Sequence, residues 1–516
     1  MPNDIRVIDN RALLISNHNI DPNTLGVKTK LVSGDRLLVK WDIPSTLALS
    51  KLSIEVPSPI EQNYAWRGMH KPFAHQKVMS SFLTKHKKAF CFSEMGTGKT
   101  ASAIWASDYL ISKGYINRVL VICPLSVMDS VWRGDLFKFA MHRKVDIAFG
   151  SKEKRKKIIA SKAEYVIINY DGIDVVFDAV KNGGFDLIII DEANAYKNTS
   201  TKRWKLINKL ITPTKWLWMM TGSPAAQSPV DAYGLAKLVN PNNVPRYAGT
   251  FKEGVMYRLS QFRWMPKPNA KQVVFRALQP AIRFTKKECL DLPEIMTVRR
   301  TIPLTRQQEK YYKILKENML MRVGGEAVTA VNAAVSVNKL LQVSQGAVYT
   351  DEHNILEFDM SNRYQALHDI LEESTKKVIV FVPFKHVIKI LMQKLKKDNI
   401  AVDFIDGSVP VSKRTSIFSS FQNSDTPELL LLQPATAAHG ITLTAANTVV
   451  WWGVVSSLET YSQANARIHR AGQDEPCTIV QLAGSRVERN IYDMLDKRID
   501  VHKQMISLYE NISEVA

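Results

Sequence analysis

Close cysteine pairs are missing from this sequence. Its 516 residues include only four cysteines, Cys91, Cys123, Cys289 and Cys477, and no two of them show the CxxC spacing. This pattern argues against a structural zinc site and a disulfide framework, and it fits a reducing compartment. No apolar run approaches the ~20 residues of a membrane-spanning helix, and the first residues lack the order of a secretory signal. We therefore expect a soluble cytoplasmic protein with no membrane partner.

Acidic residues are too few to balance the basic ones. The chain has 49 Asp and Glu against 69 Lys and Arg, a formal charge of +20. Such an excess favours a polyanionic partner, most simply nucleic acid, although a basic but unspecialised surface is the alternative. The first 70 residues hold eight basic and seven acidic side chains, so the excess belongs to the rest of the chain.

Internal repeats and low-complexity tracts are also absent, and the length suits roughly three domains of ~150 residues. Residues 1–65 favour short strands, with a hairpin of 27–32 and 37–41 around Ser33-Gly34-Asp35. Beyond residue 70, short β-branched runs alternate with helical stretches, which is typical of parallel sheets. The runs lie at 118–123, 165–168, 185–190 and 377–382. Residues 228–370 between the two blocks look helical, chiefly at 307–320 and 330–341, and show no strand rhythm.

A glycine-rich loop, Ser93–Thr100, follows a short apolar strand and precedes a helical stretch. This strand–loop–helix order is the context in which such a loop cradles phosphates. Gly96 and Gly98, on either side of Thr97, let backbone N–H groups approach the phosphates, and the helix N-terminus adds a favourable dipole.

The loop ends in the residues that contact the nucleotide most directly. Lys99 would reach the β- and γ-phosphates and Thr100 would hold Mg²⁺. Ser93 stands where the general pattern has its first glycine, a variation that helicase-like proteins share. The pattern therefore predicts an ATP site.

Asp191-Glu192 follows the apolar strand 187–190 directly. A carboxylate at the carboxyl end of a strand near the phosphate loop suits Mg²⁺, and the neighbouring Glu192 would polarise the attacking water. An acidic pair after a strand is by itself weak evidence for an ATP site. Together with the phosphate loop 92 residues earlier (191 − 99), it becomes strong evidence.

From these motifs the sequence resembles superfamily 2 helicases, and more narrowly the Swi/Snf-type double-stranded DNA translocases, over about residues 70 to 500. Asp191-Glu-Ala-Asn194 resembles their DExx box, and the resemblance makes Gln76 the adenine reader. Other segments are similar to the family's remaining motifs in order: Cys123–Ser126, Thr221–Pro224, Arg283–Pro293, Asp406–Ser408 with Arg414, His439–Leu443 and Gln463–Arg470 followed by Gln473. By this likeness Ser126 and Gly440 contact DNA and Gln463 contacts the nucleotide.

Arg467 and Arg470 stand three residues apart on a predicted helix, so both can point the same way. The resemblance implies that they act as arginine fingers on the transferring phosphate. Without it, two surface arginines on a solvated helix would be the better interpretation.

The resemblance implies an α/β fold of two RecA-like parallel-sheet lobes with helical protrusions between them and a small β-rich N-terminal domain. We expect that domain at 1–65, lobe 1 at 66–227, the protrusions and linker at 228–370, and lobe 2 with C-terminal helices at 371–516. Asp-Glu-Ala-Asn differs from the boxes common in nucleosome remodellers, and the protrusions are short. We therefore expect a compact form of bacterial or viral origin, in a bacterial cell or a virus-infected host cell.

The implied activity is a DNA-dependent ATPase that uses ATP and Mg²⁺ to move along duplex DNA as a monomer, remodelling branched DNA at forks or recombination intermediates. A strand-separating DNA or RNA helicase is one alternative. A nucleotide-gated nucleic-acid-binding protein without productive turnover is another.

Two basic stretches and a tryptophan pair allow more than one interpretation. Lys152–Lys157 has five basic residues and one acid, and Lys376–Lys397 has seven lysines and no acid. Each could contact phosphates, but a solvated helix face is the more common meaning of such a run. Trp451-Trp452 could stack on a base or pack in the core.

Overall fold

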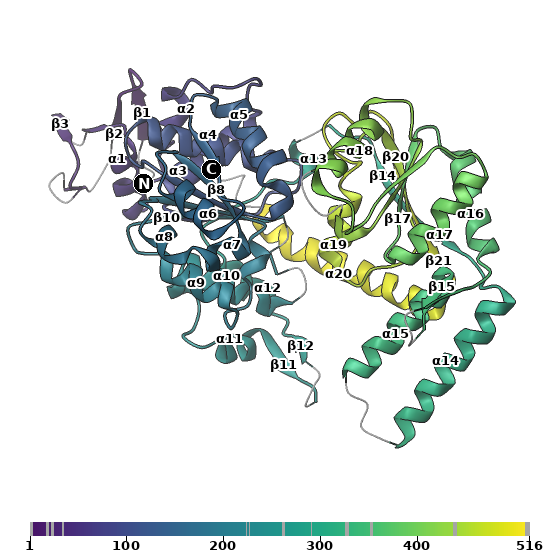
Figure 1. The fold of residues 1–516 in the computed structure, drawn as a ribbon. Coiled ribbons are helices and arrows are strands. Elements are labelled where there is room, and N and C mark those ends of the chain that lie inside the picture. Colours follow the sequence, from purple (N-terminus) through teal and green to yellow (C-terminus); the bar gives the residue numbers. More distant parts are fainter. Residues whose placement is uncertain are drawn as a thin grey trace. The chain divides into compact units, whose positions relative to one another are not determined.

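The computed structural model describes residues 4–16, 20–21, 25–33, 36–222, 224–225, 228–260, 264–289, 291–325, 330–350, 354–436 and 441–510. The chain divides into two units, Met1–Cys289 with Met505–Ala516 and Leu290–Gln504. Each unit contains one large parallel sheet flanked by helices (Figure 1), which confirms the predicted α/β class. Within the described residues, no helix has both the length and the hydrophobicity to span a membrane.

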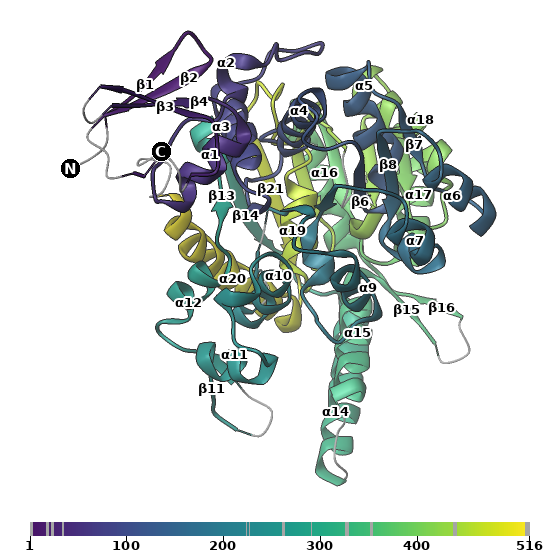
Figure 2. The same cartoon turned by 90° about the vertical axis from the view of Figure 1, so that its left-hand side faces the viewer.

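A separate antiparallel sheet at the N-terminus has the order β1-β2-β4-β3 (Figure 2). Its strands are β1 (Asp4–Ile8), β2 (Ala12–Ser16), β3 (Thr29–Ser33) and β4 (Arg36–Lys40). The pairing of β3 with β4 confirms the predicted hairpin, although Gly34 and Asp35 of its turn lie outside the described residues. Alternate side chains of β2 and β4 are buried on one face. The helix that follows, α1 (Ile43–Lys51), packs Ile43 into the core of the first large sheet.

The first large sheet has seven parallel strands in the order β13-β5-β10-β9-β6-β8-β7. Their bounds are β5 (Lys88–Cys91), β6 (Val119–Cys123), β7 (Val145–Ile147), β8 (Tyr165–Asn169), β9 (Leu187–Asp191), β10 (Trp216–Met220) and β13 (Ala281–Ile282). Since side chains alternate between the faces of a strand, Leu187 and Ile189 of β9 join one core layer and Ile188 and Ile190 the other. This two-sided burial explains the continuous apolar runs.

Helices cover both faces of this sheet. The layer that contains Leu187 includes side chains of α3 (Ala74–Lys85), α4 (Lys99–Ser112) and α5 (Gly134–Ala140). The opposite layer includes side chains of α9 (Lys202–Leu210), α10 (Ala232–Val239), α11 (Ala248–Val255) and α12 (Ala270–Ala277). Shorter helices between the strands are α6 (Lys152–Ile159), α7 (Tyr170–Val175) and α8 (Phe177–Lys181), and α2 (Ile60–Asn63) and α13 (Lys286–Cys289) complete the set.

Between the two blocks, most of the predicted helix is present, but the expectation of no strands was wrong. This part of the chain contains the hairpin β11 (Met256–Arg258) and β12 (Trp264–Pro266), the hairpin β15 (Ala347–Tyr349) and β16 (Ile355–Glu357), and the strands β13 and β14 (Ile295–Thr301). β13 pairs with β5 at the edge of the first sheet. Four of these strands have three residues and β13 has two, which is too short for a period-2 pattern to show.

The second large sheet has six parallel strands in the order β14-β21-β20-β17-β19-β18. They are β14, β17 (Lys377–Phe381), β18 (Val402–Ile405), β19 (Leu429–Leu432), β20 (Ala446–Trp451) and β21 (Cys477–Ala483). The helices are α14 (Arg306–Gly325), α15 (Ala330–Gln345), α16 (Ser361–Glu373), α17 (Lys385–Lys397), α18 (Val411–Asn423), α19 (Leu458–Asn465) and α20 (Arg486–Glu510). The long helices α14 and α15 lie side by side in both views (Figures 1 and 2) and confirm the two helices predicted there.

Both tryptophans at the end of β20 belong to the core. Neither Trp451 nor Trp452 exposes any surface. The indole N–H of Trp451 donates to Asn465 at 2.8 Å, and that of Trp452 donates to the backbone carbonyl of Gln345 at 3.0 Å. Of the two interpretations of this pair, packing is therefore confirmed, because a buried ring cannot stack on a base.

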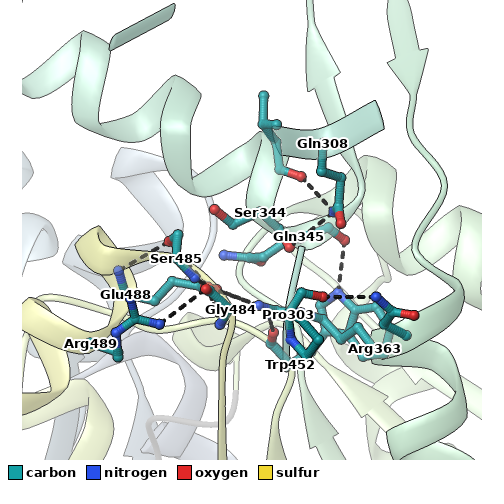
Figure 3. Close-up of polar contacts among 12 residues, drawn as sticks. Pro303, Gln308, Ser344, Gln345, Arg363, Trp452, Gly484, Ser485, Glu488 and Arg489 are labelled. Carbon is teal, nitrogen blue, oxygen red and sulfur yellow. Dashed lines mark hydrogen bonds and ion pairs between the residues drawn. The ribbon is translucent and has the colours of Figure 1, made fainter. Parts of the chain in front are cut away.

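An ion pair is buried beside Trp452 (Figure 3). Arg363 of α16 donates to both carboxylate oxygens of Glu488 at 2.9 and 2.8 Å, and also to the backbone carbonyl of Trp452. Glu488 further accepts the backbone N–H groups of Gly484 and Ser485 at the start of α20. One carboxylate thus fixes both the end of β21 and the first turn of the last helix.

Candidate active site

The phosphate loop has the strand–loop–helix geometry that its sequence predicts. It joins β5 to α4, and Gly98 is the N-cap of that helix. Gly96 and Gly98 have φ values of 90° and 82°, a region that non-glycine residues rarely adopt. The loop therefore turns its backbone N–H groups inward at the first turn of α4, where anions are favoured.

Backbone carbonyls of the phosphate loop hold the side chain of Lys99. Its ammonium group donates to the carbonyls of Ser93 at 2.7 Å and Glu94 at 3.0 Å. The Ser93 side chain is fully buried and accepts the backbone N–H of Phe284 at 3.0 Å. A glycine could not make this bond, so the serine ties the start of the loop to the segment that follows β13.

Gln76 lies directly against Gly98. Its side chain closes a capping box at the start of α3 by accepting the Phe73 N–H at 3.0 Å. A Cβ atom added at Gly98 would overlap the Gln76 Nε2 atom. The neighbouring His75 contacts the Thr97 carbonyl through Nε2 at 2.9 Å. The predicted adenine reader and the predicted phosphate loop are therefore in contact.

The carboxyl ends of three strands bring the remaining groups of the first unit together. Cys91, Met220 and Asp191 are in register at the ends of β5, β10 and β9. The Thr221 N–H, one residue further, donates to the Cys91 carbonyl at 3.1 Å. The loop after β5 and the acidic pair after β9 thus begin on the same edge of the sheet, with Thr221 between them.

Asp191 is held by a residue that sequence reasoning did not assign to it. The indole N–H of Trp132 donates to the Asp191 carboxylate at 2.9 Å. Desolvation raises the pKa of Asp191, and the Trp132 bond and the charge of Lys99 act in the opposite direction. The adjacent Glu192 has a φ of 50°, an unusual conformation for a residue with a side chain that often marks functional sites.

Arg283 supports the loop from the edge strand. This buried side chain donates to the Phe92 carbonyl at 3.1 Å and to the Glu94 carboxylate at 3.3 Å. Glu94 also accepts the backbone N–H of Lys286. The similarity of 283–293 to a family segment gave no reason to expect this contact, because 189 residues separate the two side chains.

The two predicted DNA-contact residues have different outcomes. Ser126 is exposed just after the end of β6, on a short 3₁₀ turn. Gly440 lies outside the described residues, as does His439 of the same motif, so only Ile441, Thr442 and Leu443 of that motif are described.

The expected helical placement of Arg467 and Arg470 was wrong. Helix α19 ends at Asn465, and both arginines follow it. The Arg467 carbonyl accepts the N–H of Leu443 at 3.0 Å, a tertiary bond to the preceding motif. Spacing on an ideal helix therefore says nothing about the two guanidinium groups.

Both guanidinium groups instead contact the neighbouring motif. Arg467 is 2% exposed and donates to the Ile441 carbonyl at 3.2 Å. Arg470 is half-buried and donates to the Thr442 hydroxyl at 3.4 Å. Gln463 is buried on α19 and contacts Glu459 at 3.4 Å. Of the three predicted side chains, Arg470 is the least buried.

Comparison with protein families identifies the chain. The SNF2-related domain matches residues 75–371, more than half of the sequence, and a helicase conserved C-terminal domain matches residues 362–472. The chain belongs to the SNF2-related family. This membership confirms the resemblance drawn from the motifs.

Individual relatives of this SNF2-related chain are distant. An uncharacterized ATP-dependent helicase of Mycoplasma genitalium is 26% identical over 80% of this chain, which spans 40% of that protein. Putative protein p41 of Acyrthosiphon pisum secondary endosymbiont phage 1 is 23% identical over 79% of this chain, which spans 92% of it. A chromodomain-helicase-DNA-binding protein 1-like of Mus musculus is 24% identical over 80% of this chain, which spans 47% of it. The matched part of the chain thus spans less than half the length of two of these relatives.

Among solved structures, the Sulfolobus solfataricus SWI2/SNF2 ATPase core in complex with dsDNA is similar, with 24% identity and a TM-score of 0.42. The match covers 87% of this chain and 96% of that core.

Proposed function

We propose that this protein hydrolyses Mg-ATP and uses the energy to translocate on duplex DNA. The observation that carries the proposal is the shared edge of the first sheet, where the phosphate loop and Asp191-Glu192 begin in register. A glycine cradle, a lysine and an acidic pair are the parts that phosphoryl transfer from ATP requires. Family membership supports the same chemistry.

Each residue of the first unit has a proposed role. The Lys99 ammonium replaces its bonds to loop carbonyls with bonds to the β- and γ-phosphates. Thr100 and Asp191 hold Mg²⁺, which when bound neutralises phosphate charge. Glu192 polarises the attacking water, and Gln76 recognises adenine next to Gly98. The residues fit the ion because the Asp191 carboxyl lies at this edge of the sheet, where the Trp132 indole and the charge of Lys99 oppose the desolvation that raises its pKa.

For Arg470 of the second unit we keep the role that the resemblance implies, a positive charge for the transferring phosphate. It is less buried than Arg467 and Gln463, which fit positioning roles inside the fold. We retain residues 66–227 and 371–516 as the two motor lobes and 228–370 as the protrusions and linker.

DNA is the proposed track. The net charge of +20 favours a polyanion, and the name of the mouse relative describes a DNA-binding helicase. Branched DNA is the proposed preferred form because residues 1–70, which include the β1–β4 sheet and helix α1, have eight basic and seven acidic side chains. Helix α1 packs Ile43 into the core of the ATP-binding sheet. Such balanced charge favours a structure-sensing role over phosphate tracking.

The test is steady-state phosphate release with fork, linear duplex and single-stranded DNA. We expect stimulation that is greatest with fork DNA and is abolished by Lys99→Ala and by Glu192→Gln. Absence of stimulation by any DNA would overturn the translocase proposal. A strong preference for single strands would instead support a strand-separating helicase, and turnover that survives Lys99→Ala would refute the assigned site.

A further inference from the structure

A short segment of the first unit carries a large share of the chain's excess charge. Residues 244–279 hold seven basic side chains and one acid, Glu253, a net charge of +6 out of +20. Six of the seven lie in the described residues: Arg246, Lys252, Arg258, Lys267, Lys271 and Arg276. They belong to α11, the hairpin β11–β12, α12 and their connections, which we call the basic hairpin module (Figure 1).

The module is a folded part of the first unit. Phe251, Val255 and Val274 bury its inner face against the core of the large sheet. The Lys267 N–H donates to the Val255 carbonyl at 2.9 Å, which ties the end of the hairpin to α11. Its basic side chains are therefore presented by a fixed scaffold.

Hydrogen bonds to neighbouring residues also hold the backbone at the start and at the end of the module. The Asn243 side chain donates to the carbonyl of Arg276 at 3.0 Å, at the end of α12. The Tyr233 hydroxyl of α10 donates to the carbonyl of Arg246 at 2.8 Å. The backbones of these two arginines are thus anchored, while their side chains are exposed.

Three arginines of the module have no carboxylate partner among the described residues. Among the described residues, Arg246, Arg258 and Arg276 form no ion pair, and all three side chains are exposed. On other basic helices of the same unit, by contrast, Lys156 pairs with Glu153 and Arg203 with Asp171. The positive charge of the module therefore remains available to an external anion.

Two aromatic rings of the module each have a cation over one face. The Arg246 guanidinium lies 5.4 Å from the centre of the Tyr247 ring, and the Lys252 ammonium lies 4.0 Å from that of Trp264. Such cation–π contacts orient the two charged groups on the surface of the module.

We propose that the basic hairpin module binds the sugar–phosphate backbone of duplex DNA, as a contact separate from the motif residues. This rests on the proposed function, because it supplies a further hold on the same track. Arginine and lysine contacts to phosphates carry no sequence information, which suits a protein that moves along DNA. An acidic surface of another protein is the other polyanion that would fit this charge.

The test measures how duplex binding depends on salt. The affinity of the full-length protein for a labelled linear duplex is measured between ~50 and ~200 mM salt, for wild type and for the triple variant Arg246→Gln, Arg258→Gln, Arg276→Gln. Each lost phosphate contact lowers the slope of log K against log salt by about 0.9, so the slope should fall by about 2 to 3. Affinity at ~0.1 M salt should fall about tenfold or more, while ATP turnover without DNA stays unchanged.

A matched variant controls for net charge alone. Lys152→Gln, Lys154→Gln, Lys157→Gln removes three exposed charges from α6 of the same unit. We expect it to alter the slope less than the module variant, and thermal unfolding should be equal for both. Equal slopes in the two variants would overturn the proposal, as would an unchanged slope in the module variant, which would favour an acidic protein as the partner. If the wild-type protein itself binds no duplex, the proposed function fails, and the inference about the module fails with it.

Discussion

Removing one carboxylate from the second unit should cost much of its stability. The side chains of Arg363 and Glu488 are 3% and 0% exposed, so Glu488→Gln leaves a guanidinium charge buried without its anion (Figure 3). Breaking a buried pair from one side costs about 3–5 kcal/mol, a large part of the roughly 5–15 kcal/mol that stabilises a folded domain.

The expected signal is a large fall in melting temperature. For a unit of this size, 1 kcal/mol shifts Tm by about 2–4 °C, so 3–5 kcal/mol predicts about 6–20 °C. The assay is thermal unfolding by circular dichroism, with hydrogen exchange in α16 and the first turn of α20 to locate the loss.

An exposed pair in the same unit is the control. Arg300 and Glu373 form an ion pair with side chains 30% and 60% exposed, and surface pairs contribute about 0–1 kcal/mol. Glu373→Gln should therefore lower Tm by less than about 4 °C. A Glu488→Gln shift no larger than the Glu373→Gln shift would refute the reasoning. The double variant Arg363→Met, Glu488→Met should recover part of the loss, because it leaves no unpaired charge.

Two further predictions concern the ATP site. Gly98→Ala should weaken nucleotide binding at least about tenfold, because its methyl group would displace Gln76 in addition to straining a backbone at φ 82°; titration with a fluorescent ATP analogue measures this. Gly114→Ala, at φ 71° with open space around it, should lower stability only, and equal loss of binding in both variants would contradict the contact. Trp132→Phe should lower the rate of ATP hydrolysis about tenfold or more, since hydrogen bonds to charged groups are worth about 1.5–3 kcal/mol. Trp105→Phe, a buried indole bonded to the Arg67 carbonyl at 2.8 Å, is the control, and steady-state rates that fall equally would refute a specific role for Trp132.

The parts of the fold that the sequence predicts are those set by local patterns. Two-sided burial makes the β9 run continuously apolar, and the glycines of the phosphate loop are required by its backbone conformation. Helix α17 likewise buries Val387, Ile388, Leu391 and Leu395, which have the spacing of one helix face. The phosphate loop and its helix could be placed for the same reason.

The parts that escaped prediction depend on contacts between distant residues. Nothing near Trp132 shows that its indole would reach Asp191, 59 residues later. Helix α19 ends at Asn465, and the carbonyl of Arg467 beyond it accepts the N–H of Leu443, a tertiary contact that no spacing rule can reveal. β13, two residues long, is a strand only because β5 lies beside it.

Displacement of a third strand from a DNA triplex tests the central claim most directly. A protein that moves along intact duplex should release the third strand when ATP is hydrolysed, while the two strands beneath it stay paired. Glu192→Gln should bind the substrate without releasing that strand. ATP hydrolysis by the wild type with no release of the third strand would contradict translocation, and separation of the underlying duplex would show a strand-separating helicase instead.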